Sequence, residues 1–252
     1  MNQTDQGAAR PMACVRAQAA FESRTLLSNG EQLLVSVILP ALALVGMVNT
    51  SVPDLGAGRR IDIVAPGVLA LAVVSTAFTG QAIATAFDRR YGLLRLLGVS
   101  PLGPRGLLAG KAIAVLTVIA SQVVVLGGLA AVLGWRPQAA GLPAALVVVV
   151  LGAWVFVCLA LAMAGAVRAE GVLALANLIW VLLVIGGGLL FSTDLLPGAL
   201  ATVSSWLPWG ALGDGLRTAL FDGAFPGLEI GVLLVWGLMG TAVVARTFRW
   251  SD

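Results

Sequence analysis

The sequence predicts an all-helical integral membrane protein with six transmembrane helices. Hydrophobic residues make up 59% of its 252 residues and charged residues only 11%, whereas a soluble domain is nearer half apolar and a quarter charged. Its mean hydropathy is +0.99. This length accommodates about six spans of ~20 residues with short loops, and it leaves no room for a large soluble domain.

The distribution of basic residues predicts the orientation of these spans. With six spans, eleven of the fifteen Lys and Arg residues fall in the N-terminal lead, the loop between the second and third spans, the turn after the fourth span and the tail. The remaining four, on the opposite side, are Arg59, Arg60, Arg136 and Arg217. The positive-inside rule therefore places both termini in the cytoplasm.

The N-terminal region is expected to lie outside the membrane. Residues 1–12 are polar and predict a disordered lead, followed by a single six-helix domain at 13–250. Between 13 and 30, apolar and polar side chains alternate, which predicts an amphipathic helix lying on the inner leaflet. An ordinary solvated lead is the alternative. The first span follows from about Leu33 to Val48, and Pro40 is expected to kink it.

The second span, about Ile63 to Phe87, carries small polar residues on one face. Such a stripe usually packs against another helix. Contact with a transported substrate is the alternative, and it makes these residues, with one on the fifth span, candidates for a substrate path. The candidates are Ser75, Thr76, Thr79 and Asn177.

The remaining apolar runs complete the set of six. The third span is expected at about 107–133, the fourth at 143–167, the fifth up to about Leu190 and the sixth at 228–245. Pro143 suits the first turn of a helix.

A charged stretch, residues 88–106, separates the second span from the third. From Asp88 to Arg95, leucines form an apolar side and arginines a cationic side, which predicts a short amphipathic helix at the membrane surface. Gly98 is expected to end it. A charged element held between two membrane helices suits a contact with a cytoplasmic partner.

Residues 192–227 are expected to form an outer hairpin. They are too apolar for a free loop, and Pro197 and Pro208 break them too often for one span. Two short helices meeting at Leu207-Pro208 would dip into the outer leaflet and leave unpaired backbone groups at their junction.

This hairpin is a candidate outer gate, and a static lid is the alternative. Tryptophans near the junction are expected at the level of the lipid headgroups. An acidic and a basic residue three positions apart could neutralise each other. The candidate gate residues are Trp206, Pro208, Trp209, Asp214 and Arg217.

Several kinds of chemistry are excluded or disfavoured. The chain has no His, so a Ser-His-Asp site and a His-ligated metal are excluded, and no metal-ligand spacing or nucleic-acid patch is present. Gly110-Lys111 is no P-loop, because Ala112 stands where Ser or Thr must bind magnesium. Lys111 is instead expected to extend towards the cytoplasmic headgroups.

Two motifs resemble those of a known family. The stretch Asp88-Arg-Arg-Tyr-Gly-Leu-Leu-Arg-Leu-Leu-Gly-Val-Ser-Pro101 is similar to a coupling-helix motif of the form acidic-Arg…Gly…Leu-Arg…Pro. Leu207-Pro208 followed by Leu216-Arg-Thr-Ala-Leu220 is similar to a re-entrant hairpin motif, Pro…Leu-Arg-x-Ala-Leu. In this order along six spans, they resemble the type-2 ABC transporter permeases, the membrane subunits of drug, lipid and polysaccharide exporters. Asp88 departs from the usual Glu.

The resemblance implies a transport subunit without enzymatic activity of its own. The coupling helix would dock on a separate P-loop ABC ATPase subunit, of which each complex has two. These subunits bind ATP and magnesium, while this chain binds no cofactor. The resemblance also implies a multi-pass protein of a bacterial-type plasma (inner) membrane, with a second permease copy or homologue as its dimer partner and lipids around it. The implied ATPase-coupling residues are Asp88, Arg89, Arg90, Tyr91, Gly92, Leu93, Arg95 and Leu96.

The expected function is therefore ATP-driven export of a lipophilic or amphiphilic substrate such as a drug, lipid or glycolipid. An ion-coupled secondary transporter is the alternative, and an intramembrane enzyme or structural subunit is a third class. Ion-coupled transporters usually place an ionisable residue at mid-membrane. Here every Asp and Glu falls at or near a predicted span end, and Gln122 and Asn177 are the clearly internal polar residues.

Overall fold

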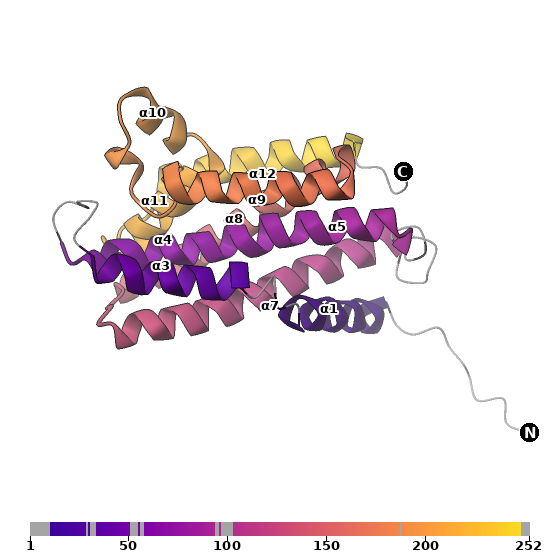
Figure 1. The fold of residues 1–252 in the computed structure, drawn as a ribbon, viewed down its shortest axis with the longest axis horizontal. Coiled ribbons are helices and arrows are strands. Elements are labelled where there is room, and N and C mark those ends of the chain that lie inside the picture. Colours follow the sequence, from indigo (N-terminus) through magenta and orange to yellow (C-terminus); the bar gives the residue numbers. More distant parts are fainter. Residues whose placement is uncertain are drawn as a thin grey trace, which may run out of the picture.

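The structure, a computed structural model, describes residues 11–28, 30, 34–50, 55, 58–93, 96, 103–186 and 188–247. Its helices run side by side along one long axis (Figure 1). The longest of them combines α4 (Arg60–Val74), a π-helical segment (Ser75–Gly80) and α5 (Gln81–Arg90). The most apolar window of this helix is 89% buried, so the remaining helices pack around it.

Five helices of the described part are long and apolar enough to cross a membrane. They are the helix formed by α4 and α5, and then α7 (Gly103–Val132), α8 (Leu142–Ala166), α9 (Ala169–Gly186) and α12 (Gly227–Thr247). They agree with the second to sixth expected spans. A 3₁₀ turn, Ala139–Gly141, leads into α8.

The first expected span is shorter than the others. A π-helical segment, Leu34–Ile38, continues directly into α3 (Leu39–Val48), and the apolar helix Ser36–Val48 falls below the length of the five spans. Pro40 lies where the π-helical segment passes into α3. The kink expected at Pro40 stays a prediction.

Helix α1 (Pro11–Ser28) forms where the amphipathic N-terminal segment was predicted. Residues 1–10 of the predicted disordered lead lie outside the described residues. The helix packs along the first half of α7 (Figure 1), burying Ala19 and Leu26, while Met12 and Phe21 remain exposed. Its position on a membrane surface stays a prediction.

The segment expected to form the outer hairpin consists of short helices at the other end of the bundle from α1 (Figure 1). It contains a 3₁₀ turn (Thr193–Leu195), α10 (Ala199–Ser205) and α11 (Pro208–Leu220). Helix α11 packs against α4, α8 and α12 and is buried over most of its length.

The outward faces of the peripheral helices are apolar. In the most apolar windows of α7, α9 and α12, only 33%, 22% and 17% of the residues are buried. Val124, Ile185 and Leu238 are among the exposed large side chains. Contiguous apolar surface of this extent is expected where lipid, or another membrane protein, covers a helix.

Candidate functional site

The end of α5 carries the residues expected to couple the protein to an ATPase. Asp88, Arg89 and Arg90 form the last turn of α5 and continue the second spanning helix. The sequence reading began a separate amphipathic helix at Asp88, and this boundary is wrong. The helix continues because Phe87 and the preceding residues keep packing against α8 and α9.

Gly92 ends this helix. The N–H of Tyr91 bonds to the carbonyl of Phe87, and Gly92 has a φ of +71°, a conformation that favours glycine. Beyond it, Leu93 and Leu96 are exposed. Arg95 and Gly98 lie outside the described residues, as do the other masked positions of the loop predicted at 88–106, which are 94, 97 and 99–102.

Lys111 connects three elements at this end of the molecule. Its ammonium group lies 2.8 Å from the carboxylate of Glu22 on α1 and 2.8 Å from that of Asp88 on α5. The Lys111 side chain is 5% exposed. Lys111 was expected to reach towards the headgroups, and this is wrong, because two carboxylates compensate its charge inside the protein.

The approach of α1 to α7 depends on a glycine. A Cβ atom at Gly110 would lie 2.8 Å from the Cγ atom of Gln18, so a larger residue would displace α1. Gln18 also donates a hydrogen bond of 3.0 Å to Glu22. The small residue before Lys111 thus allows Glu22 to reach the ammonium.

Arg89 and Arg90 hold the turn between α8 and α9. Arg89 donates to the carbonyl of Val167 at 3.0 Å, and Arg90 forms an ion pair with Glu170. The guanidinium of Arg90 also lies 5.9 Å from the ring centroid of Tyr91, which stacks on Phe87. Tyr91 itself is 72% exposed.

Two of the four substrate-path candidates make hydrogen bonds between helices. Ser75 accepts a bond of 2.7 Å from the indole of Trp180, and Thr76 bonds to Gln122. Asn177 donates to the carbonyl of Leu173 in its own helix. These contacts account for Ser75 and Thr76 as packing residues, which is the usual role of such a stripe.

Thr79, the fourth candidate, belongs to a group of buried polar atoms without partners. In the described part of the chain, the Thr79 hydroxyl, both amide atoms of Gln81 and the Thr85 hydroxyl have no hydrogen-bond partner. Each of the three residues is at most 2% exposed. They flank the junction of the π-helical segment and α5, and π-helical turns are frequent at functional sites.

The outer hairpin is held by Arg217, which is 7% exposed. The expected pair with Asp214 is confirmed at 2.7 Å, and Arg217 also donates to the carbonyl of Leu189 at 2.6 Å. Asp214 accepts a further bond of 2.5 Å from the hydroxyl of Thr193. Arg217 therefore fastens α11 to the segment that follows α9.

The junction between α10 and α11 has fewer unpaired backbone groups than expected. The N–H of Leu207 bonds to Ser204, and the carbonyl of Leu207 accepts from Ala211. The carbonyl of Trp206 accepts a bond of 3.0 Å from the indole of Trp236. The expectation of an unpaired junction is thus wrong, because helix starts and a neighbouring span supply the partners.

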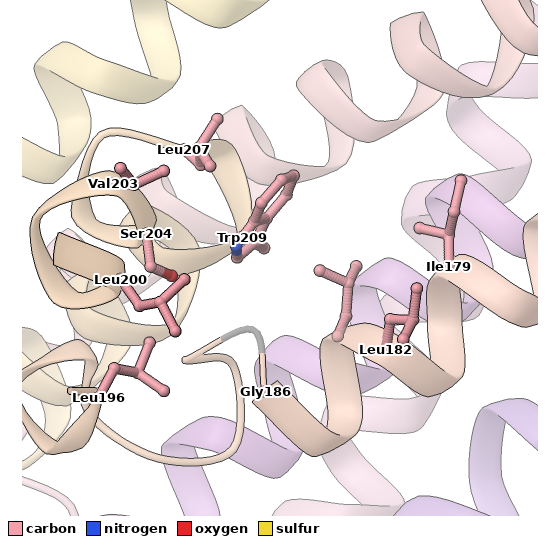
Figure 2. Close-up of a pocket in the computed structure, with 10 residues that line it drawn as sticks. Ile179, Leu182, Gly186, Leu196, Leu200, Val203, Ser204, Leu207 and Trp209 are labelled. Carbon is pink, nitrogen blue, oxygen red and sulfur yellow. The ribbon is translucent and has the colours of Figure 1, made fainter. Parts of the chain in front are cut away.

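A cavity of about 440 Å³ lies between α9 and the hairpin. In Figure 2, side chains of α9 face those of the hairpin across it, with Trp209 between them. Trp206 is 60% exposed and does not line this cavity, whereas Pro208 is buried. The lining is almost entirely apolar: Ile179, Leu182, Leu183, Gly186, Leu196, Leu200, Val203, Ser204, Leu207 and Trp209.

Sequence reasoning missed Glu22, Glu170, Arg168 and Gln81 as members of these arrangements. Glu170 lies 80 residues from Arg90 in the chain, and no local pattern links them. The pairing of Glu22 could have been suspected from the sequence, since Glu22 is an acidic residue on a helix expected near the basic end of the third span.

Comparison with known proteins supports one family. No individually curated protein matches the chain. A family model described as "ABC-2 family transporter protein" matches residues 31–246, which is most of the chain. The match covers α3 to α12 and includes the second span, the coupling stretch and the outer hairpin. The chain therefore belongs to the ABC-2 family and is a type-2 ABC transporter permease, a multi-pass membrane subunit of an ABC transporter.

Proposed function

We propose that this permease exports a lipophilic or amphiphilic substrate, such as a drug, lipid or glycolipid, as a dimer driven by two separate ABC ATPase subunits. The observation that most supports an ATPase partner is made at and beyond the end of α5, where Tyr91, Leu93 and Leu96 are exposed. Apolar side chains exposed at a helix end beside arginines suit a protein interface.

The contacts of α5 support a role in transmitting movement from an ATPase to the helix bundle. Its end is tied to α1 and α7 through Lys111, and to the turn before α9 through Arg89 and Arg90. Its other end continues into the most buried helix of the described protein. A displacement imposed on Tyr91 by an ATPase would therefore be carried into the bundle core, since packed helices move as units.

The uncharged bundle interior supports a lipophilic cargo. Among the described residues, the buried charged side chains are Glu22, Lys111 and Arg217, and each is paired near a helix end or in the hairpin. The cavity beside Trp209 is likewise apolar. Such surfaces complement alkyl or aromatic groups and offer nothing to a highly charged solute.

An ion-coupled secondary transporter is the second candidate. It needs an ionisable or cation-coordinating group near mid-membrane. Of the buried polar groups described, Gln81 is the one that most resembles such a site, and it carries no titratable proton. The observations therefore favour ATP coupling.

Reconstitution tests the proposal directly. The permease and the ABC ATPase that co-purifies with it are placed in proteoliposomes with a fluorescent amphiphile. We expect transport that requires ATP and continues when ionophores remove the proton and sodium gradients. Transport that follows an ion gradient without ATP would overturn the proposal in favour of the second candidate.

A further inference from the structure

A cationic cavity lies where the end of α5 meets the turn between α8 and α9. Its volume is about 530 Å³, and its lining contains three guanidinium groups and one carboxylate. The lining residues are Ala86, Arg89, Arg90, Arg168, Ala169 and Glu170. With three guanidinium groups and one carboxylate, the lining carries a net positive charge of two. The carboxylate, Glu170, is paired with Arg90.

This cavity lies at the boundary of the apolar spans. Arg90 is the last residue of the spanning helix Arg60–Arg90, and Ala169 is the first residue of the span Ala169–Gly186. The ends of spanning helices lie at the depth of the lipid headgroups. A cavity between two such ends therefore opens where lipid phosphates are concentrated.

The position of Arg168 favours an anion-binding site, because the stabilisation of arginines by a helix C-terminus does not account for it. Arginines at the end of α5 are stabilised by the negative end of that helix, which accounts for Arg89 and Arg90 without a ligand. Arg168 lies instead at the start of α9, where its carbonyl accepts from the N–H of Val172. A cation is unfavourable at this positive helix end, and an anion bound beside it would remove the penalty.

Arg168 is also available for binding. It is exposed, and among the described residues its side chain forms no ion pair. Guanidinium groups match phosphate oxygens through two parallel hydrogen bonds. Basic cavities between membrane helices on the cytoplasmic side suit the headgroups of anionic lipids.

We propose that this cavity binds the phosphate group of an anionic membrane lipid, with Arg168 as its principal contact. The lipid would bridge the end of α5 to the start of α9 and so stabilise the position of α5. This inference does not depend on the proposed substrate or on an ATPase, because it concerns the permease alone.

Native mass spectrometry of the full-length permease, purified without an ATPase, tests the proposal. The protein is titrated with phosphatidylglycerol and, separately, with phosphatidylcholine. We expect retained phosphatidylglycerol adducts on the wild type and no comparable retention of phosphatidylcholine. Arg168→Gln should weaken phosphatidylglycerol binding about fivefold, the effect of one cation near an anionic membrane surface.

Two further variants make the test specific. Arg136→Gln removes an exposed arginine at the opposite end of α7 and should leave binding unchanged. Glu170→Gln removes the cavity's carboxylate and should strengthen binding, a gain that misfolding cannot imitate. Unchanged binding by both Arg168→Gln and Glu170→Gln, or an equal loss in Arg136→Gln, would overturn the proposal.

Competition identifies the source of the phosphate. Inorganic phosphate that displaces the lipid at equal concentration would assign the cavity to a free anion and overturn the lipid assignment. An Arg168→Gln protein that retains lipid normally but loses affinity for an ATPase would assign the cavity to a protein partner, which also overturns it.

Discussion

Lys111, near the start of α7, forms an ion pair of 2.8 Å with Asp88, which lies in the last turn of α5. The Asp88 side chain is 22% exposed and that of Lys111 only 5%. The same ammonium binds Glu22. One buried cation thus positions the end of α5 relative to α1 and α7.

Replacing Lys111 with Met should destabilise the permease strongly. The change leaves Glu22 and Asp88 without their cation, and removing one partner of a buried ion pair costs about 3–5 kcal/mol. We expect a clearly lower midpoint of thermal unfolding in detergent. Arg136→Met, at an exposed position, should change stability by less than about 0.5 kcal/mol.

Adding Glu22→Gln and Asp88→Asn to Lys111→Met should recover much of the lost stability, because no buried charge is then left unpaired. A single Lys111→Met variant that unfolds like the wild type would show that the ion pair contributes nothing.

Reversing the charges of Arg90 and Arg95 to Glu should uncouple the ATPase from an inserted permease. The change turns two cations at the expected docking contact into anions, which reverses the charge that this contact presents to the ATPase. The measurement is substrate-stimulated ATP hydrolysis in proteoliposomes, with insertion checked by protease accessibility. The alternative role, enforcement of membrane topology, predicts a misinserted protein instead.

A swapped pair separates docking from folding at the same position. Arg90→Glu combined with Glu170→Arg keeps opposite charges in contact across the turn before α9. We expect this variant to fold normally and still couple poorly. Full coupling in the swapped variant would mean that Arg90 acts only through its ion pair.

Gln81→Leu should leave the permease at least as stable as the wild type. Both amide atoms of Gln81 are buried without partners among the described residues, and an unsatisfied buried group costs about 1–3 kcal/mol. We also expect export to fall, since a polar group kept at this cost suggests a contact made in another state of the transport cycle.

The matched control is Gln122→Leu, which breaks the bonds to Thr76 at 2.8 and 3.0 Å. It should lower the unfolding midpoint because it leaves the Thr76 hydroxyl buried without its partner. Normal export by Gln81→Leu would show that Gln81 makes no contact that transport requires.

Cross-linking the outer hairpin to its counterpart in a dimer should block substrate release while sparing ATP binding. Ser204 is 5% exposed and unsuitable for this, whereas Leu200 on α10 is 59% exposed. Cysteine at position 200, in a variant lacking Cys14 and Cys158, is therefore the better site. Oxidation should stop export and reduction restore it, whereas a cross-linked protein that exports normally contains a static lid.

The sequence alone was sufficient to predict the five helices of the described part that are long and apolar enough to cross a membrane, because that property depends on local composition. A run of about 20 apolar residues can be recognised in the sequence without knowledge of its neighbours in space, and α7, α8, α9 and α12 lie where such runs were found. The hairpin could be predicted for the same reason, since Pro208 breaks an apolar run and begins α11. The Asp214–Arg217 pair followed from helical spacing.

Tertiary structure decided which partner each buried polar group finds. Lys111 turns inward because α1 brings Glu22 to it across 89 residues of chain, and Arg90 meets Glu170 only when α5 and α9 pack together. Asp88 to Arg90 extend the second span because α8 and α9 cover that turn. Ion pairs and helix ends depend on neighbours distant in the chain, whereas hydropathy depends on the segment itself. Only the folded bundle could therefore determine the partners and the length of α5.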